Sequence, residues 1–213
     1  EIVSSDDFDS ERMNIDWQWN HNPVNEAWSL TERKGWLRLK TSRVTDNLYL
    51  APNTLTQRME GPECSGIVKM DISHMKDGDI AGFSAFNGDA GVVKIVKDGK
   101  KVFVVADSQN VELTDKEKRV TKVDVTESYR QQLRKQKEIY FRIDANFRPG
   151  KDVADFYYST DGKDWVKVLE GYKMIFDYRR FFMGSKFAIF NYATKKTGGY
   201  VDIDWFNYSK SEK

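Results

Sequence analysis

The sequence is poor in the residues from which many catalytic and metal centres are built. Among its 213 residues there is one cysteine and there are two histidines. The single thiol, Cys64, excludes an intrachain disulfide and a cysteine-based metal cluster, so we expect a small buried side chain there. His21 and His74 lie far apart in the chain, and no Gly-x-Ser-x-Gly elbow accompanies them. A zinc centre and a serine-hydrolase triad are therefore not indicated.

The chain also lacks an excess of charge of either sign. It has 34 Lys and Arg against 33 Asp and Glu, a net charge of +1. This balance gives no electrostatic reason to expect a nucleic acid or an anionic membrane surface as partner. No apolar run approaches the roughly 18 residues of a membrane-spanning helix. Residues 1–4 lack the basic and apolar regions of a signal peptide, so a signal peptide, if the protein has one, has been removed or lies upstream.

What the chain has in abundance is short runs of alternating apolar and polar residues, a period that is typical of half-buried strands. Asp98-Gly99 and Asp161-Gly162 supply hairpin turns between neighbouring runs. Since alternating β-α-β units are absent, the pattern predicts an all-β fold with two antiparallel sheets packed face to face, in a single domain over residues 1–213. About ten strands are expected, at residues 36–39, 66–72, 80–86, 91–96, 101–105, 139–145, 154–159, 165–168, 187–192 and 200–206.

One segment, residues 114–138, interrupts this rhythm because it is crowded with charge. We expect a solvated loop there, with room for a short helix over residues 127–136 capped by Thr126. A nucleic-acid patch is the less favoured interpretation, because acidic residues interleave with the basic ones and no aromatic stacking platform accompanies them.

A glycosidase built on such a sandwich needs two carboxylates directed into one cleft. No Glu-x-Asp-x-Glu or Glu-x-Asp-x-x-Glu run occurs. Asp202 and Asp204 share one face of a predicted strand, but no Glu completes the set. We therefore predict no catalytic residue in this chain.

Three blocks, in this order, carry a family resemblance. They are Trp-Gln-Trp-Asn-His-Asn-Pro at residues 17–23, Asn-Thr-Leu-Thr-Gln-Arg at residues 53–58, and Asp-Trp-Phe at residues 204–206. Together they resemble the C-terminal β-sandwich domain of family 43 glycoside hydrolases, the β-xylosidase and α-arabinofuranosidase group. The resemblance runs from about Asp7 to Tyr208.

The resemblance implies a jelly-roll sandwich of the concanavalin A-like type that serves as an accessory to a catalytic propeller. The implied partners are a glycoside hydrolase catalytic domain and plant cell-wall oligo- or polysaccharide such as xylan or arabinoxylan. Since polysaccharide is degraded outside the cytoplasm, a periplasmic or secreted location is expected, with a cytoplasmic one still open. Two other functions also stay open: a sandwich glycosidase in its own right, and a purely structural interaction module.

In the first block, strand alternation places both indoles on one face and Gln18 on the other. The tryptophans are either core residues or a surface on which a sugar stacks. In the second block Gln57 and Arg58 point to opposite faces, and the guanidinium fork suits sugar hydroxyls or, equally, a structural ion pair. The candidate carbohydrate-binding residues are Trp17, Gln18, Trp19, Asn20, His21, Arg58 and Tyr192, with Asn191 as a weaker one.

A structural calcium ion is the one cofactor that the residues suggest, since this cation takes several oxygen ligands. Sandwich lectins often join their first and last strands in this way. Asp7 near the start and Asp204 near the end are the candidate ligands, with Asp6, Asp9 and Asp202 nearby in sequence. The alternative is that these are ordinary surface acids.

Overall fold

The computed structural model describes residues 3–114, 119–174 and 184–211, which fold into two seven-stranded sheets. In the first sheet the spatial order is β1 (Gln18–Trp19), β4 (Leu55–Arg58), β13 (Lys186–Ala193), β6 (Asp79–Phe86), β7 (Ala90–Asp98), β8 (Lys101–Leu113) and β9 (Val120–Leu133). In the second it is β12 (Val166–Lys173), β11 (Val153–Ser159), β10 (Glu138–Asn146), β5 (Glu63–Asp71), β14 (Tyr200–Ser211), β3 (Leu37–Lys40) and β2 (Trp28–Ser29).

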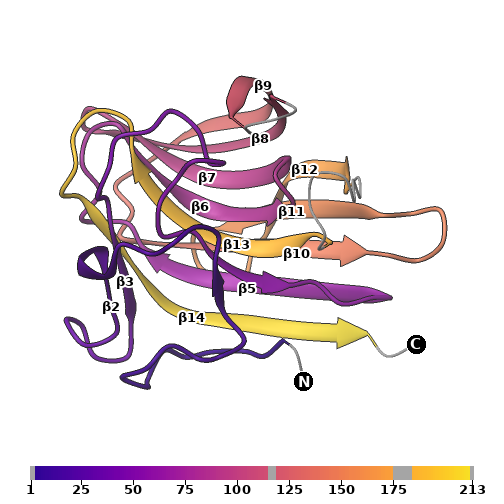
Figure 1. Cartoon of the computed structure of the whole chain (residues 1–213), viewed down its shortest axis with the longest axis horizontal. Coiled ribbons are helices and arrows are strands. Elements are labelled where there is room, and N and C mark those ends of the chain that lie inside the picture. The colour runs from indigo at the N-terminus through magenta and orange to yellow at the C-terminus, as the bar shows by residue number, and fades with distance from the viewer. Residues whose placement is uncertain (1–2, 115–118, 175–183, 212–213) are drawn as a thin grey trace.

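Neighbouring strands in both sheets are antiparallel. The described helical structure is a single 3-10 turn, η1 (Asn25–Ala27). Figure 1 shows the sheets as two layers, with the two chain ends close together at one end of β14. The predicted all-β sandwich is confirmed. Among the described residues, no helix has the length and apolar character that a bilayer crossing requires.

The strand alternation explains the core. Along β10, residues Ile139, Phe141, Ile143 and Ala145 are buried, whereas the residues between them are half-buried. A period of two places all four side chains on the face that meets the opposite sheet. Asp98-Gly99 closes the β7–β8 hairpin, and Gly99 takes the positive φ of 60° that such a turn favours.

Aromatic rings join the layers at the centre of the sandwich. Phe206 on β14 lies 5.0 Å from Trp17, 5.7 Å from Phe187 and 6.2 Å from Phe83, measured between ring centroids. Phe8, from the N-terminal segment, stacks on Trp17 at 5.9 Å. These five rings come from the N-terminal segment, both sheets and both ends of the chain, so their packing ties the termini into the core.

The predictions for residues 114–138 are wrong in their described part. Instead of a loop or a helix, these residues include β9, which pairs with β8 from Val102 opposite Leu133 to Leu113 opposite Val120. Residues 127–133 have fair helix propensity, but pairing with the long β8 overrides it. A bulge opposite Ala106 and Asp107 places the Ser128 hydroxyl 2.9 Å from the Val168 carbonyl oxygen and 3.2 Å from that of Ala106, so its single proton is shared between the two acceptors. The β9 side chains are mostly exposed, which accounts for the charge.

Cys64 is buried, as expected, at 3% exposure. Burial raises the pKa of its thiol to about 11, so the residue is a neutral packing group at physiological pH. His74 is exposed and its ring stacks on that of Tyr200. The predicted burial of Cys64 is therefore confirmed.

Replacing Phe206 by Ala removes the ring that contacts three others, and we expect the free energy of unfolding to fall by about 3–5 kcal/mol. The same replacement at Phe103, which is half-buried outside the central core, is the matched control and should cost about 1 kcal/mol. Urea denaturation followed by tryptophan fluorescence measures both. Equal losses in the two variants would contradict the central role of Phe206.

Candidate functional site

The edge of the first sheet gathers three polar side chains on its outer face. Gln18 on β1 pairs with Thr56 on β4, and Arg58 two residues along pairs with Lys186 on β13. The Lys186 ammonium donates a hydrogen bond to Gln18 Oε1 at 3.1 Å. Gln57 turns the other way and is buried at 1% exposure. The predicted division between Gln57 and Arg58 is therefore confirmed.

A small hollow opens beside these residues. It measures about 190 Å³ and is lined by Ile15, Asp16, Gln18 and Arg58. Burial lowers the pKa of the Lys186 ammonium, and the positive charge of Arg58 lowers it further. Two cations, an amide and a carboxylate thus stand together, a mixture of donors and acceptors that suits sugar hydroxyls.

The tryptophans of the first block face the core. Trp17 is 6% exposed, and its Nε1 donates to Asp6 Oδ2 at 2.8 Å. Trp19 is half-buried and packs on Trp28 at 5.5 Å. The predicted arrangement of two indoles on one side and Gln18 on the other is present. Trp17, however, has no ring face open to a sugar, and its role is to anchor β1.

Asn20 and His21 follow β1 toward the loop at residues 42–53. The backbone N–H of Asn20 donates a hydrogen bond to the Thr54 carbonyl at 2.9 Å, which extends the β1–β4 pairing. His21 is exposed, and its Nε2 lies 2.8 Å from the Tyr49 carbonyl oxygen. Both residues are held by backbone contacts, and any contact they make with sugar stays a prediction.

Tyr192 is buried, unlike Gln18 and Arg58 at the edge of the sheet. It is 2% exposed, in a second apolar cluster on the outer face of the first sheet that Leu48 and Ala51 cover. Burial raises the pKa of its phenol, and the charge of Asp107 adds to the effect. Asn191 points to the opposite side and donates to the Leu39 carbonyl at 2.9 Å. Neither side chain is open to a polymer, because the loop at residues 42–53 closes over one and the core encloses the other.

Of the predicted residues, the structure thus brings Gln18 and Arg58 together at an open surface. It adds Lys186, Asp16 and Ile15, which sequence reasoning missed. Lys186 precedes a predicted strand, and strand alternation alone does not show which strand lies next to it. Ile15 and Asp16 adjoin the tryptophan block, but their exposure follows from the path of the N-terminal segment.

The candidate calcium ligands do come close in space. The negative charge of Asp7 raises the pKa of the Asp9 carboxyl, and Asp204 contributes to the same effect. Asp204 also lies 3.1 Å from the ammonium of Lys69. In the part of the chain that the structure describes, no group of three or more His, Cys, Asp or Glu side chains is placed to hold a metal ion. Calcium at Asp7 and Asp204 stays a prediction.

Comparison with known proteins identifies the family. Residues 5–209 match GH43_C2, the beta-xylosidase C-terminal concanavalin A-like domain. The chain belongs to this family.

A beta-xylosidase from Formosa agariphila is 29% identical over 228 residues, a match that covers 96% of the chain and 35% of the relative. A solved bifunctional GH43-CE protein from Bacteroides eggerthii is 38% identical with a TM-score of 0.85, and the match covers 100% of the chain and 26% of that protein. A GH43 glycoside hydrolase engineered for both endo-xylanase and exo-arabinofuranosidase activity is 31% identical with a TM-score of 0.88, at 98% and 40% coverage. The chain therefore spans well under half the length of these relatives.

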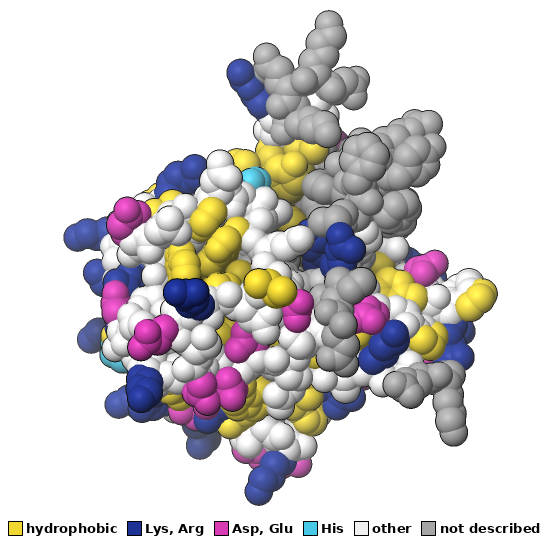
Figure 2. All heavy atoms as spheres, turned by 60° about the horizontal axis from the view of Figure 1, so that its bottom comes forward, with side chains coloured by type: hydrophobic (Ala, Val, Ile, Leu, Met, Phe, Trp, Pro, Cys, Tyr) yellow, Lys and Arg dark blue, Asp and Glu magenta, His cyan; other side chains and the backbone are white. Residues whose placement is uncertain are grey.

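This GH43_C2 domain does hold two buried carboxylates side by side. Asp71 and Asp202 face each other across β5 and β14 and are 2% and 1% exposed. Arg33 contacts them at 2.8 and 3.3 Å, and Arg38 contacts Asp202 at 2.8 Å. Figure 2 shows acidic and basic side chains mixed over much of the displayed face of the molecule.

This pair is unsuited to glycoside hydrolysis. Although burial opposes ionisation, hydrogen bonds from Ser73 and Arg33 outweigh it and hold the pKa of Asp71 below its ordinary value. A glycosidase acid needs the opposite, a raised pKa and an open path to substrate. Asp71 and Asp202 are instead structural anions paired with arginines.

The lowered pKa of the Asp71 carboxyl makes the free energy of unfolding depend on pH. Its pKa is lowered from 3.8 in the folded state, so its contribution to stability is complete above about pH 5 and is lost as the pH falls through the lowered pKa. At neutral pH we expect Asp71→Asn to lose about 1.5–3 kcal/mol of unfolding free energy. The variant should also lose less stability than the parent between about pH 5 and pH 2.

Urea titrations at several pH values measure both effects, with Asp98→Asn at an exposed position as the control. Parallel stability curves for the parent and Asp71→Asn over the acid range would show that Asp71 is not held as an anion.

Proposed function

We propose that this domain is the non-catalytic accessory part of a xylan- or arabinoxylan-degrading glycoside hydrolase. In this proposal it packs against the catalytic module and presents Gln18 and Arg58 to the sugar chain. The observation that carries it is the edge hollow, where an exposed apolar side chain stands beside a set of sugar-compatible polar groups. The family membership and the much greater length of the relatives support it.

Ile15 carries the packing step. It is 94% exposed, the highest value among the exposed large apolar side chains of the described residues. A single exposed apolar residue is common on protein surfaces, but this one lines the hollow that holds Gln18 and Arg58. Contact with a catalytic module would remove it from water and bring the hollow to the edge of that module's pocket.

The sugar-binding step depends on Gln18, Arg58 and Lys186. An amide offers both a donor and an acceptor, and a guanidinium can hold two hydroxyls at once. The Lys186–Gln18 hydrogen bond orients the amide before any ligand arrives. Because the partners are polysaccharide and the enzyme that degrades it, a periplasmic or secreted location forms part of the proposal.

Two alternatives are weaker. A glycosidase centre needs a carboxylate pair across a cleft, and the one buried pair in the described chain is neutralised by arginines. A purely structural module would explain Ile15 but not the grouping of Gln18, Arg58 and Lys186. The two experiments below separate packing from sugar binding.

Ile15→Asp should leave the Tm of the chain alone nearly unchanged, because the side chain is already in water. In the protein that includes the catalytic module, the same change should lower stability by about 1.5–3 kcal/mol, the value of burying such a side chain. Thermal melts of both forms measure this. Val125→Asp, at an exposed position on β9, is the control. An equal response in the two forms would exclude Ile15 from the interface.

Arg58→Ala should weaken retention of the chain by xylan or arabinoxylan in affinity electrophoresis by about tenfold, as expected for loss of a charge-assisted hydrogen bond. Arg148→Ala is the control, because this arginine pairs with Glu63 and lies outside the lining of the edge hollow. Retention unchanged by Arg58→Ala, or absent in the parent chain, would contradict direct sugar binding at this edge.

A further inference from the structure

A second and larger cavity lies away from the edge hollow. It measures about 930 Å³, within the range of small-molecule pockets, and sits between the β7–β8 turn and the link from β9 to β10. β1 and β9 are the opposite edges of the first sheet, so the two sites are separate. Twelve residues line the cavity: Ile72, Ser73, Lys97, Lys100, Lys101, Val102, Gln132, Leu133, Arg134, Lys135, Gln136 and Lys137.

Half of that lining is cationic and none of it is acidic. The five lysines and one arginine make no ion pair with any other described residue, whereas Arg33, Lys94 and Arg142 are paired with carboxylates elsewhere. Acidic residues near the cavity lie outside its lining. Glu138 lies 3.5 Å from Lys69, Asp98 is in the β7–β8 turn, and Asp77 pairs with Lys195 while the charge of Lys97 contributes to lowering its pKa. Although the net charge of the chain is only +1, six cationic side chains gather around this cavity without an acidic residue in its lining. Such a cluster raises the local concentration of anions.

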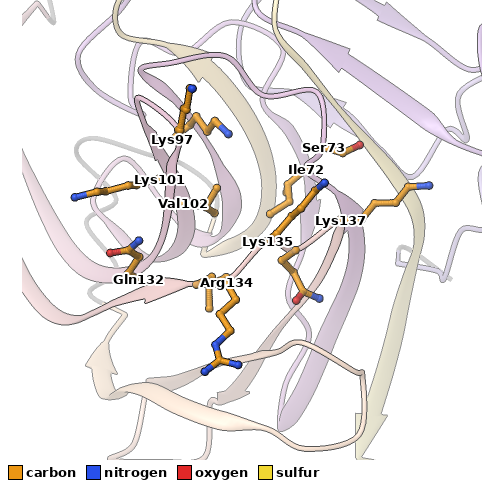
Figure 3. Close-up of a pocket in the computed structure, with 12 residues that line it drawn as sticks. Ile72, Ser73, Lys97, Lys101, Val102, Gln132, Arg134, Lys135 and Lys137 are labelled. Atoms are coloured by element: carbon orange, nitrogen blue, oxygen red, sulfur yellow. The ribbon is translucent and has the colours of Figure 1, made fainter.

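The cavity has an apolar floor and a wall held by hydrogen bonds. Ile72, Val102 and Leu133 supply the floor, and Figure 3 shows Ile72 and Val102 among the surrounding cationic side chains. The Ile72 amide donates to the Lys137 carbonyl at 2.9 Å. Gln136 Nε2 donates to the carbonyls of Glu138 and Thr160 at 2.7 and 3.1 Å. These bonds fix the link that carries three of the cations.

We propose that this cavity binds a sugar chain that carries carboxylates, that is, one substituted with uronic acid. The cations would pair with the carboxylates, and the apolar floor would accept the C–H face of a ring. Nucleic acid is less suited, because no aromatic side chain lines the cavity to stack a base. The choice of carbohydrate over other polyanions rests on the proposed function, and the geometry of the cavity is independent of it.

The test is titration calorimetry with a glucuronoxylan oligosaccharide and with the same oligosaccharide after reduction of its carboxylates to alcohols. The combined variant Lys101→Gln, Arg134→Gln and Lys135→Gln removes three cavity charges. The matched control removes the same charge at exposed positions outside the lining, by Lys151→Gln, Lys163→Gln and Lys196→Gln. All six positions are exposed, so both variants should fold, which a thermal melt checks.

We expect the acidic oligosaccharide to bind at least tenfold more tightly than the reduced one. This preference should weaken with added salt, disappear in the cavity variant and persist in the control. Equal binding of the two oligosaccharides, or no effect of the cavity variant, would overturn the proposal. Equal binding of a single-stranded oligonucleotide would also overturn it, in favour of a non-selective polyanion site.

The outcomes also separate this proposal from the preceding one. If neutral arabinoxylan binds through Arg58 and the acidic oligosaccharide gains nothing, the uronate site alone fails. If the acidic oligosaccharide binds through the cavity and neutral xylan is not retained, the sugar-binding part of the edge hollow alone fails.

Discussion

The packing of Phe206 against Trp17, Phe83 and Phe187 is the contact on which the rest of the structure depends. It joins the last strand to the N-terminal segment and to the opposite sheet. Trp17 immediately precedes β1, so its burial determines which way that short strand faces. With Trp17 and Trp19 turned inward, Gln18 must point outward, and Ile15 is left in water at the rim of the edge hollow.

Charge is organised around the same framework. Asp71 and Asp202 lie deep in the second sheet but are neutralised by arginines, and Lys94 lies 2.6 Å from Asp107 on the first sheet. Such pairs stabilise a fold only when both partners are present. Because of this pairing and burial, Asp71 and Asp202 lack the open path to substrate that a glycosidase acid needs. The cavity at the β9–β10 link is the exception, because its lining cations form no ion pair with another described residue.

Most strands could be predicted from the sequence because apolar and polar residues alternate in any strand that buries one face. Ile139 to Ala145 and the Asp98-Gly99 turn are examples. β9 could not, because both of its faces are largely solvated and its charged residues carry no alternation. Pairing with β8 decides its conformation, and that is a tertiary effect.

The candidate functional residues fall into the same two groups, those that local alternation predicts and those whose position depends on tertiary structure. Gln18 and Arg58 were predictable from alternation within their own strands. Tyr192 has a similar local pattern, yet the loop at residues 42–53 buries it through Leu48 and Ala51. Lys186 reaches the edge hollow only through the order of strands in the first sheet. The six cations of the larger cavity come together only through the β7–β8 turn and the β9–β10 link. No local sequence signal specifies either arrangement.

The central proposal is that this GH43_C2 domain assists catalysis by a partner module without performing it. Reducing-sugar release from xylan and arabinoxylan by the purified chain, at enzyme concentrations high enough to detect slow turnover, tests it most directly. The account predicts no release above the buffer control. Turnover by the chain that is lost in an Asp71→Asn or Asp202→Asn variant that still folds would contradict it.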